Sequence, residues 1–135
     1  MIDVRIFTTA QDHLDALWKT DEDAAAEIET ALEEIAQDQR LAERLDRKKF
    51  RNIGTPSIEV DVFEELFKRG YNLYRLKFWD WEGGLLPYRV LYASDPKNDI
   101  FYILAVIPRD HSYDTTHPVV QRVVADYERL GLSTY

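Results

Sequence analysis

Three strand-like segments follow one another along residues 72–107, with only short turns between them. Residues 72–79 alternate along the chain, and residues 86–93 resume an apolar pattern after a Gly-Gly turn. Residues 100–107 form an unbroken apolar run, which is typical of a strand buried on both faces. Because connections this short join antiparallel neighbours, this part of the chain predicts a three-stranded antiparallel sheet.

Helical spacing dominates the residues before this sheet. Residues 2–7 alternate like a short first strand, but Ile28, Leu32 and Ile35 recur on one face of a helix. Residues 57–67 fit both a strand and a helical turn, so their structure is left open. The N-terminal half is therefore expected to consist of one strand followed by helices.

A last amphipathic helix is expected near the C-terminus. Thr116-His-Pro118 is typical of a helix start, because proline is tolerated in the first turn, and Gly131 is a natural stop. At 135 residues the chain has the size of one compact domain. The whole order predicts a small α+β fold over residues 1–135: a strand and helices, then the three-stranded antiparallel sheet, then a helix.

Several classes of site are excluded by composition. The chain has no cysteine, which rules out disulfides, thiolate zinc sites and a cysteine nucleophile. Its three histidines are scattered, so neither a metal site nor a cofactor is expected. The N-terminus does not resemble a signal peptide, and no apolar stretch is long enough for a membrane span. A cytoplasmic protein without a membrane partner is therefore predicted.

The charge is unevenly distributed. The formal net charge of −8 argues against binding to nucleic acid, which depends on Lys and Arg. Residues 1–50 hold 7 basic and 13 acidic side chains, whereas residues 68–113 hold 7 basic and 5 acidic ones. An acidic helical half thus precedes a mildly basic sheet half, so the sheet is where an anionic substrate would bind.

Cationic side chains lie within the predicted strands, and an arginine, a histidine and a tyrosine lie just after the last one. Side chains two apart in a strand point to one face, and neighbouring strands lie about 5 Å apart, so these groups can converge on one patch. Cations that hold phosphate beside an imidazole or a phenol suit phosphodiester chemistry. The candidate catalytic residues are Arg75, Lys77, Arg89, Arg109, His111 and Tyr113.

Structural roles compete with this interpretation for each residue. Arg75 and Lys77 are of a type that often keeps a sheet soluble. Arg89 lies among apolar residues and fits a salt bridge to a helix acid as well as it fits a phosphate ligand. His117, directly before Pro118, suits a helix cap.

Residues 65–115 resemble the RelE/ParE superfamily of toxins from type II toxin–antitoxin systems. The resemblance lies in an ordered series of strand motifs, which are Tyr74-Arg-Leu-Lys77, Tyr88-Arg-Val-Leu-Tyr92 and Phe101-Tyr-Ile-Leu-Ala-Val-Ile-Pro-Arg109 closing on Tyr113-Asp114. It implies a RelE-like fold. RelE-like members are ribosome-dependent endoribonucleases that cut mRNA without a metal, through attack of a 2′-hydroxyl on the adjacent phosphate.

The resemblance also assigns roles to the strand cations. It implies that Arg75 and Lys77 contact the RNA backbone and assist proton transfer. It makes Arg89 a phosphate ligand and lets Arg109 stabilise the pentavalent phosphate.

The remaining implied features concern the loop after the last strand and the partners. The resemblance places Tyr113 on the scissile nucleotide and His111 where some relatives carry an acid–base group. It implies a cognate antitoxin, with which the chain would form a hetero-oligomer, and mRNA on the ribosome as the substrate. No cofactor is implied.

Two other functions compete with an mRNA interferase. A ParE-like protein would inhibit DNA gyrase by binding and would cleave nothing, in which case a helical surface carries the function. The negative charge of residues 12–38 fits such a protein, because an acidic surface can mimic DNA. The third alternative is an inactive fold relative that serves as an interaction module, since a fold does not fix a function.

Overall fold

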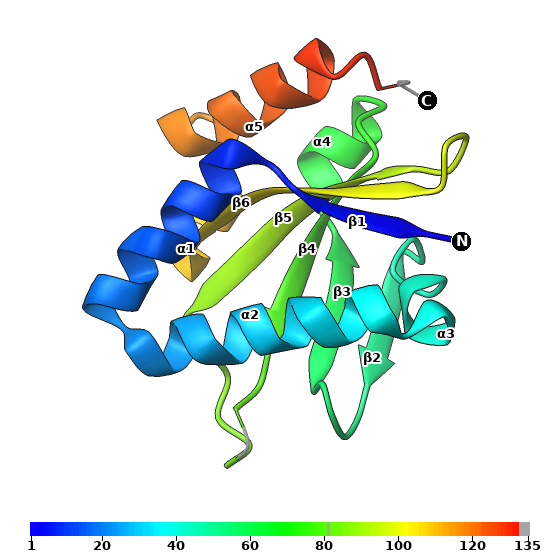
Figure 1. Ribbon diagram of the computed structural model, residues 1–135. Coiled ribbons are helices and arrows are strands. Elements are labelled where there is room, and N and C mark those ends of the chain that lie inside the picture. Colours follow the sequence, from blue (N-terminus) through cyan, green and yellow to red (C-terminus); the bar gives the residue numbers. More distant parts are fainter. Residues whose placement is uncertain (81, 133–135) are drawn as a thin grey trace.

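A mixed sheet of six strands, in the order β1-β6-β5-β4-β3-β2, forms the centre of the protein (Figure 1). The computed structural model describes residues 1–80 and 82–132, except the side chain of Tyr113. Helices pack on both faces of the sheet. In chain order the elements are β1 (Asp3–Ile6), α1 (Thr8–Thr20), α2 (Glu22–Gln37), α3 (Gln39–Ala42), β2 (Lys49–Asn52), β3 (Ile58–Val62), α4 (Glu64–Lys68), β4 (Leu73–Phe78), β5 (Tyr88–Asp95), β6 (Ile100–Pro108), the 3-10 turn η1 (Arg109–Tyr113) and α5 (Pro118–Arg129).

The α+β architecture is confirmed, but the expected three-stranded antiparallel sheet is wrong. β4, β5 and β6 are the three predicted strands, and β1 joins them by pairing parallel to β6. β2 and β3 extend the other side of the sheet as antiparallel neighbours. β2 was not predicted, because a cation such as its Lys49 is equally typical of the last turn of a helix. β3 lies within residues 57–67, whose pattern fits both a strand and a helical turn. The unbroken apolar run is indeed an internal strand, since β6 lies between β1 and β5.

Polar side chains fix where the helices begin. Asp21 accepts a hydrogen bond from the backbone N–H of Ala24 at 3.3 Å, which caps α2. Asp38 interrupts the helical region and caps α3. His117 caps α5 through its Nδ1 atom, which accepts the N–H of Val119 at 3.1 Å. The suggested capping role of His117 is thereby confirmed.

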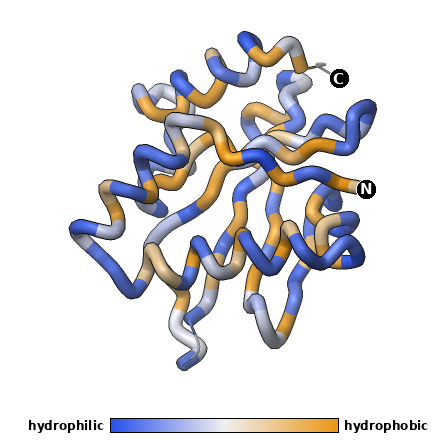
Figure 2. The backbone as a smooth tube through the Cα atoms, viewed as in Figure 1, coloured by the Kyte–Doolittle hydropathy of each residue, from blue (hydrophilic) through white to orange (hydrophobic). Residues whose placement is uncertain are grey.

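The sheet separates two apolar cores. One core lies under α1, α2 and α3, where alternate side chains of β4 and β5, such as Leu76 and Tyr92, are buried. The other lies under α4 and α5, where Leu91, Val123 and Tyr127 pack together. Along α2 and the strands, hydrophilic and hydrophobic positions alternate, as a two-layered core requires (Figure 2). The β4 cations Arg75 and Lys77 lie on this second face, where Arg75 is buried and Lys77 is partly exposed.

No helix in residues 1–80 and 82–132 has the length and apolar character needed to cross a membrane. The same residues contain no group of three or more His, Asp or Glu side chains arranged to hold a metal ion.

The half-buried His13 is expected to make stability depend on pH. Its Nδ1 accepts the N–H of Val106 at 3.1 Å, and burial lowers the pKa of this imidazole. The unfolded chain therefore binds a proton more readily, so stability is complete above about pH 6.5 and falls as the pH drops below that value.

Urea unfolding across this pH range measures the effect. His13→Asn keeps an acceptor without a titrating group, so its stability is expected to fall less on acidification. An equal pH dependence in the two proteins would show that other groups cause it.

Candidate functional site

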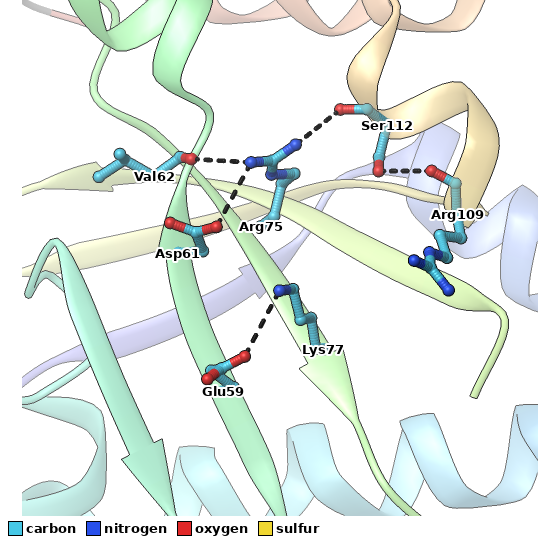
Figure 3. Close-up of polar contacts among 7 residues, drawn as sticks. All are labelled: Glu59, Asp61, Val62, Arg75, Lys77, Arg109 and Ser112. Carbon is cyan, nitrogen blue, oxygen red and sulfur yellow. Dashed lines mark hydrogen bonds and ion pairs between the residues drawn. The ribbon is translucent and has the colours of Figure 1, made fainter. Parts of the chain in front are cut away.

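Two cations of β4 face two acids of β3 on the sheet face that α4 and α5 cover only in part. Arg75 lies opposite Asp61 in the strand register, and Lys77 lies opposite Glu59. The nitrogen–oxygen distance is 3.4 Å in both pairs (Figure 3). The shared face of Arg75 and Lys77 is as predicted from strand alternation, but each cation already has a carboxylate beside it.

Arg75 is buried and connects three parts of the fold. Its guanidinium donates to the carbonyl oxygens of Val62 and Ser112, each at 3.3 Å, in addition to the contact with Asp61. It also lies over the ring of Phe63, with 5.2 Å between the guanidinium carbon and the ring centroid. These contacts tie β3 and η1 to β4, so Arg75 acts as a structural clamp in this state.

Arg109 is exposed at the start of η1, directly after β6. Its backbone N–H donates to the carbonyl of Pro87, and its carbonyl accepts the hydroxyl of the buried Ser112 at 2.7 Å. The backbone carbonyl of Ser112 accepts a hydrogen bond from the Arg75 guanidinium, so Ser112 links the Arg75 side chain to the backbone of Arg109 (Figure 3). Among the described residues the Arg109 guanidinium has no carboxylate partner, so it is available to an anion.

Arg89 is almost completely buried, with 1% of its surface exposed. Its Nη1 donates to the carbonyl oxygens of Leu86 at 3.1 Å and Tyr88 at 2.9 Å. The neutral carbonyls offer the buried cation hydrogen bonds, which is how a buried charge is tolerated. A phosphate could reach this guanidinium only if the surrounding chain moved.

His111 stacks on His117 rather than standing free. Their ring centroids lie 4.0 Å apart with an angle of 21° between the rings. His117 is occupied as the cap of α5, and two hydrogen bonds from Thr116 lower the pKa of the neighbouring Asp114 carboxyl. His111 is half-buried and lies two positions after Arg109, whereas the side chain of the predicted Tyr113 lies outside the described residues.

A second charged surface lies on the α1–α2 hairpin. Residues 12–38 carry ten acidic side chains against a single Lys19. Among the described residues none of these carboxylates forms an ion pair with a Lys or Arg. Trp18 is 39% exposed within this surface, and its indole N–H donates to Glu29 at 2.7 Å. We call these residues the acidic hairpin surface.

Fewer of the predicted cations on this sheet face are accessible to solvent than the sequence predicted. Arg109 is accessible and Lys77 is partly so, whereas Arg75 and Arg89 are buried. Glu59 and Asp61 were not predicted as site residues, because residues 57–67 fit a helical turn as well as a strand; their alternation with Ile58, Val60 and Val62 is the signal that could have found them. Ser112 carried no sequence signal.

One family model and one solved structure are similar to this chain. The sequence model for the ParE toxin of type II toxin–antitoxin systems, parDE, matches residues 4–113. Among solved structures, the chain is similar to the toxin–antitoxin complex RelBE2 from Mycobacterium tuberculosis, with 22% identity and a TM-score of 0.40. That match covers 80% of this chain and 98% of the other. No curated protein matches the sequence.

Proposed function

Since the chain belongs to the ParE toxin family of type II toxin–antitoxin systems, we propose that it arrests growth by binding a DNA-handling protein and cleaves no RNA. The contact surface is the acidic hairpin surface. The family membership confirms the resemblance to RelE/ParE toxins that the strand motifs carried. DNA gyrase is the target that the likeness to ParE implies.

The observation that carries this proposal is a group of carboxylates around the partly exposed Trp18 that form no ion pair with a Lys or Arg of the described residues. The carboxylates of α1 and α2 present negative charge that a DNA-binding groove would attract. Trp18 adds a large aromatic side chain, and partly exposed tryptophans are enriched among the residues that dominate binding energy. Charge and anchor together fit a protein–protein contact.

The state of the strand cations supports the same proposal. A phosphodiesterase needs several cations free to meet the reacting phosphate. Arg75 is bonded to Asp61 and to two backbone carbonyls, and Arg89 is bonded to two more. In this conformation the two arginines therefore stabilise the fold through these contacts.

We propose further that a cognate antitoxin restrains the toxin. The exposed cation Arg109 and the partly exposed Lys77 would meet acidic side chains of that partner. Such a complex would be a toxin–antitoxin hetero-oligomer in the cytoplasm.

An mRNA interferase is the second candidate, and the geometry of η1 favours it. Arg109 is exposed without a carboxylate partner among the described residues, and His111 lies two positions later in the same turn. In that mechanism Arg109 would stabilise the phosphate, Lys77 would hold the backbone, and His111 or Tyr113 would move a proton. Arg75 and Arg89 would act only after rearrangement.

Two assays on one induced culture separate the candidates. Plasmid supercoiling reports inhibition of gyrase, and mapping of mRNA 5′ ends reports cleavage. We expect plasmids to lose negative supercoiling within the arrest period while the 5′ ends stay unchanged. New 5′ ends inside translated frames, absent when Arg109→Ala is induced, would overturn the proposal in favour of the interferase.

A further inference from the structure

A basic stretch at the β2 edge of the sheet is unused by the proposed function. Six cations lie within residues 40–51, against two acids, although the chain as a whole carries a net charge of −8. All six side chains are exposed. They are Arg40, Arg44, Arg47, Lys48, Lys49 and Arg51.

These cations lie in α3, in the turn that follows it and in β2. Arg44 lies over the ring of Phe50, with 5.8 Å to the centroid, whereas Arg51 lies over the ring of Trp79 at 3.4 Å. Within the described residues no cation of the stretch forms an ion pair. Exposed cations left unpaired in an acidic protein form a surface that an anionic partner can neutralise.

The charges on this face alternate from strand to strand. Arg75 and Lys77 of β4 pair with Asp61 and Glu59 of β3 (Figure 3). The same two acids lie opposite Lys49 and Arg51 of β2, respectively. The β3 acids thus lie between a cation on each side in the strand register, and their ion pairs are with the cations of β4. A further strand beside β2 would continue the alternation by carrying acids.

The edge of β2 is open for such a strand. β2 is the last strand of the sheet, and no described strand lies beyond it. Its backbone makes no hydrogen bonds to other backbone groups outside the ladder with β3 among the described residues. Ile53, directly after the strand, is 86% exposed. An unpaired edge of this kind is a template for adding a strand.

We propose that β2 accepts an extended segment of a partner protein with acidic side chains at two alternate positions and an apolar one between them. The two acids would lie opposite Lys49 and Arg51, and the apolar side chain would lie on the other face beside Phe50. Backbone hydrogen bonds hold the segment, and the cross-strand ion pairs select it.

The charge pattern disfavours the other occupants. A second copy pairing through its own β2 would place cations against cations, and like charges directly opposite each other destabilise a sheet. Single-stranded nucleic acid usually stacks its bases on free aromatic faces. Here Arg44 and Arg51 already lie over the rings of Phe50 and Trp79.

Fluorescence anisotropy with the full-length protein tests the proposal. The probe is a labelled peptide in which glutamate and valine alternate, and the comparison peptide has the same composition with its glutamates in one block. The alternating peptide is expected to bind at low salt. Lys49→Glu with Arg51→Glu should weaken it by at least about tenfold, because two attractive cross-strand pairs become repulsive. Arg69→Glu with Lys97→Glu is the control, since it changes the net charge equally at exposed sites outside both the basic stretch and the acidic hairpin surface.

A charge swap makes the result specific. A lysine–valine peptide should bind the Lys49→Glu, Arg51→Glu protein better than the glutamate peptide does, provided that circular dichroism shows an unchanged fold. Equal binding of the blocked and alternating peptides would overturn strand addition. Binding of a uridine oligonucleotide that depends on Lys49 and Arg51, without peptide binding, would assign the edge to nucleic acid instead.

Discussion

Arg89→Ala is expected to lower the free energy of unfolding by about 3–5 kcal/mol. The side chain is 1% exposed, and its removal leaves a cavity as well as the carbonyls of Leu86 and Tyr88 without their donor. Urea unfolding followed by circular dichroism measures the loss. For a domain with a total stability of about 5–15 kcal/mol, such a change approaches unfolding at growth temperature.

Two further variants serve as comparisons for Arg89→Ala. Arg89→Met fills much of the volume but donates no hydrogen bond, so it should lose less stability than the alanine variant and thereby isolate the cavity. Arg109→Ala, at an exposed site, should change stability by no more than about 0.5 kcal/mol. An Arg89→Ala protein as stable as the parent would contradict this expectation.

Toxicity tests of Arg89 variants report on folding as well as on function. A variant of Arg89 that loses toxicity is expected to do so by unfolding, whichever target the toxin has. Arg109 is the informative residue for RNA cleavage, because it is exposed and its side chain supports no other element among the described residues. The two arginines are alike as motif residues and differ in burial.

The part of the fold that the sequence predicted is the part with local patterns. β4, β5 and β6 are joined by short turns, and α5 begins at a histidine and a proline. Their apolar periods are long enough to identify each element alone. The shared face of Arg75 and Lys77 follows from strand alternation and needs no knowledge of the neighbours.

The part that could not be predicted depends on partners distant in sequence. β2 has four residues, and its Lys49, like the preceding Lys48, is typical of a helix end until β3 is placed beside it. The pairing of β1 with β6 joins residues nearly a hundred positions apart. The burial of Arg89 depends on how the chain around Leu86 folds over it, which no local pattern encodes.

The separation of charge gives the molecule two surfaces of opposite sign. The acids of α1 and α2 lie on the sheet face that these two helices cover, whereas the basic stretch lies near the β2 edge. Both signs remain largely unpaired by ion pairs within the described chain. A toxin that must bind both a target and a controlling partner can use one surface for each, and the acidic one makes the sharper prediction about arrest.

Trp18→Ala is expected to weaken target binding by about 30- to 1,000-fold and so to abolish growth arrest. A tryptophan at the centre of an interface commonly contributes about 2–4 kcal/mol. Trp18 is 39% exposed, so its loss should leave the core intact. Trp18→Phe keeps an aromatic ring but loses the hydrogen bond to Glu29, and is expected to retain part of the toxicity. Survival on inducing plates, with the protein level checked, measures both.

Leu85→Ala is the matched control, because Leu85 is a large apolar residue that is 41% exposed outside the acidic hairpin surface. This variant should arrest growth like the parent. If toxicity survives Trp18→Ala and is lost in Arg109→Ala, the acidic hairpin surface is not the contact, and the cations of the sheet carry the function. The decisive comparison is therefore between one exposed tryptophan on α1 and one exposed arginine on η1, because neither substitution disturbs a core.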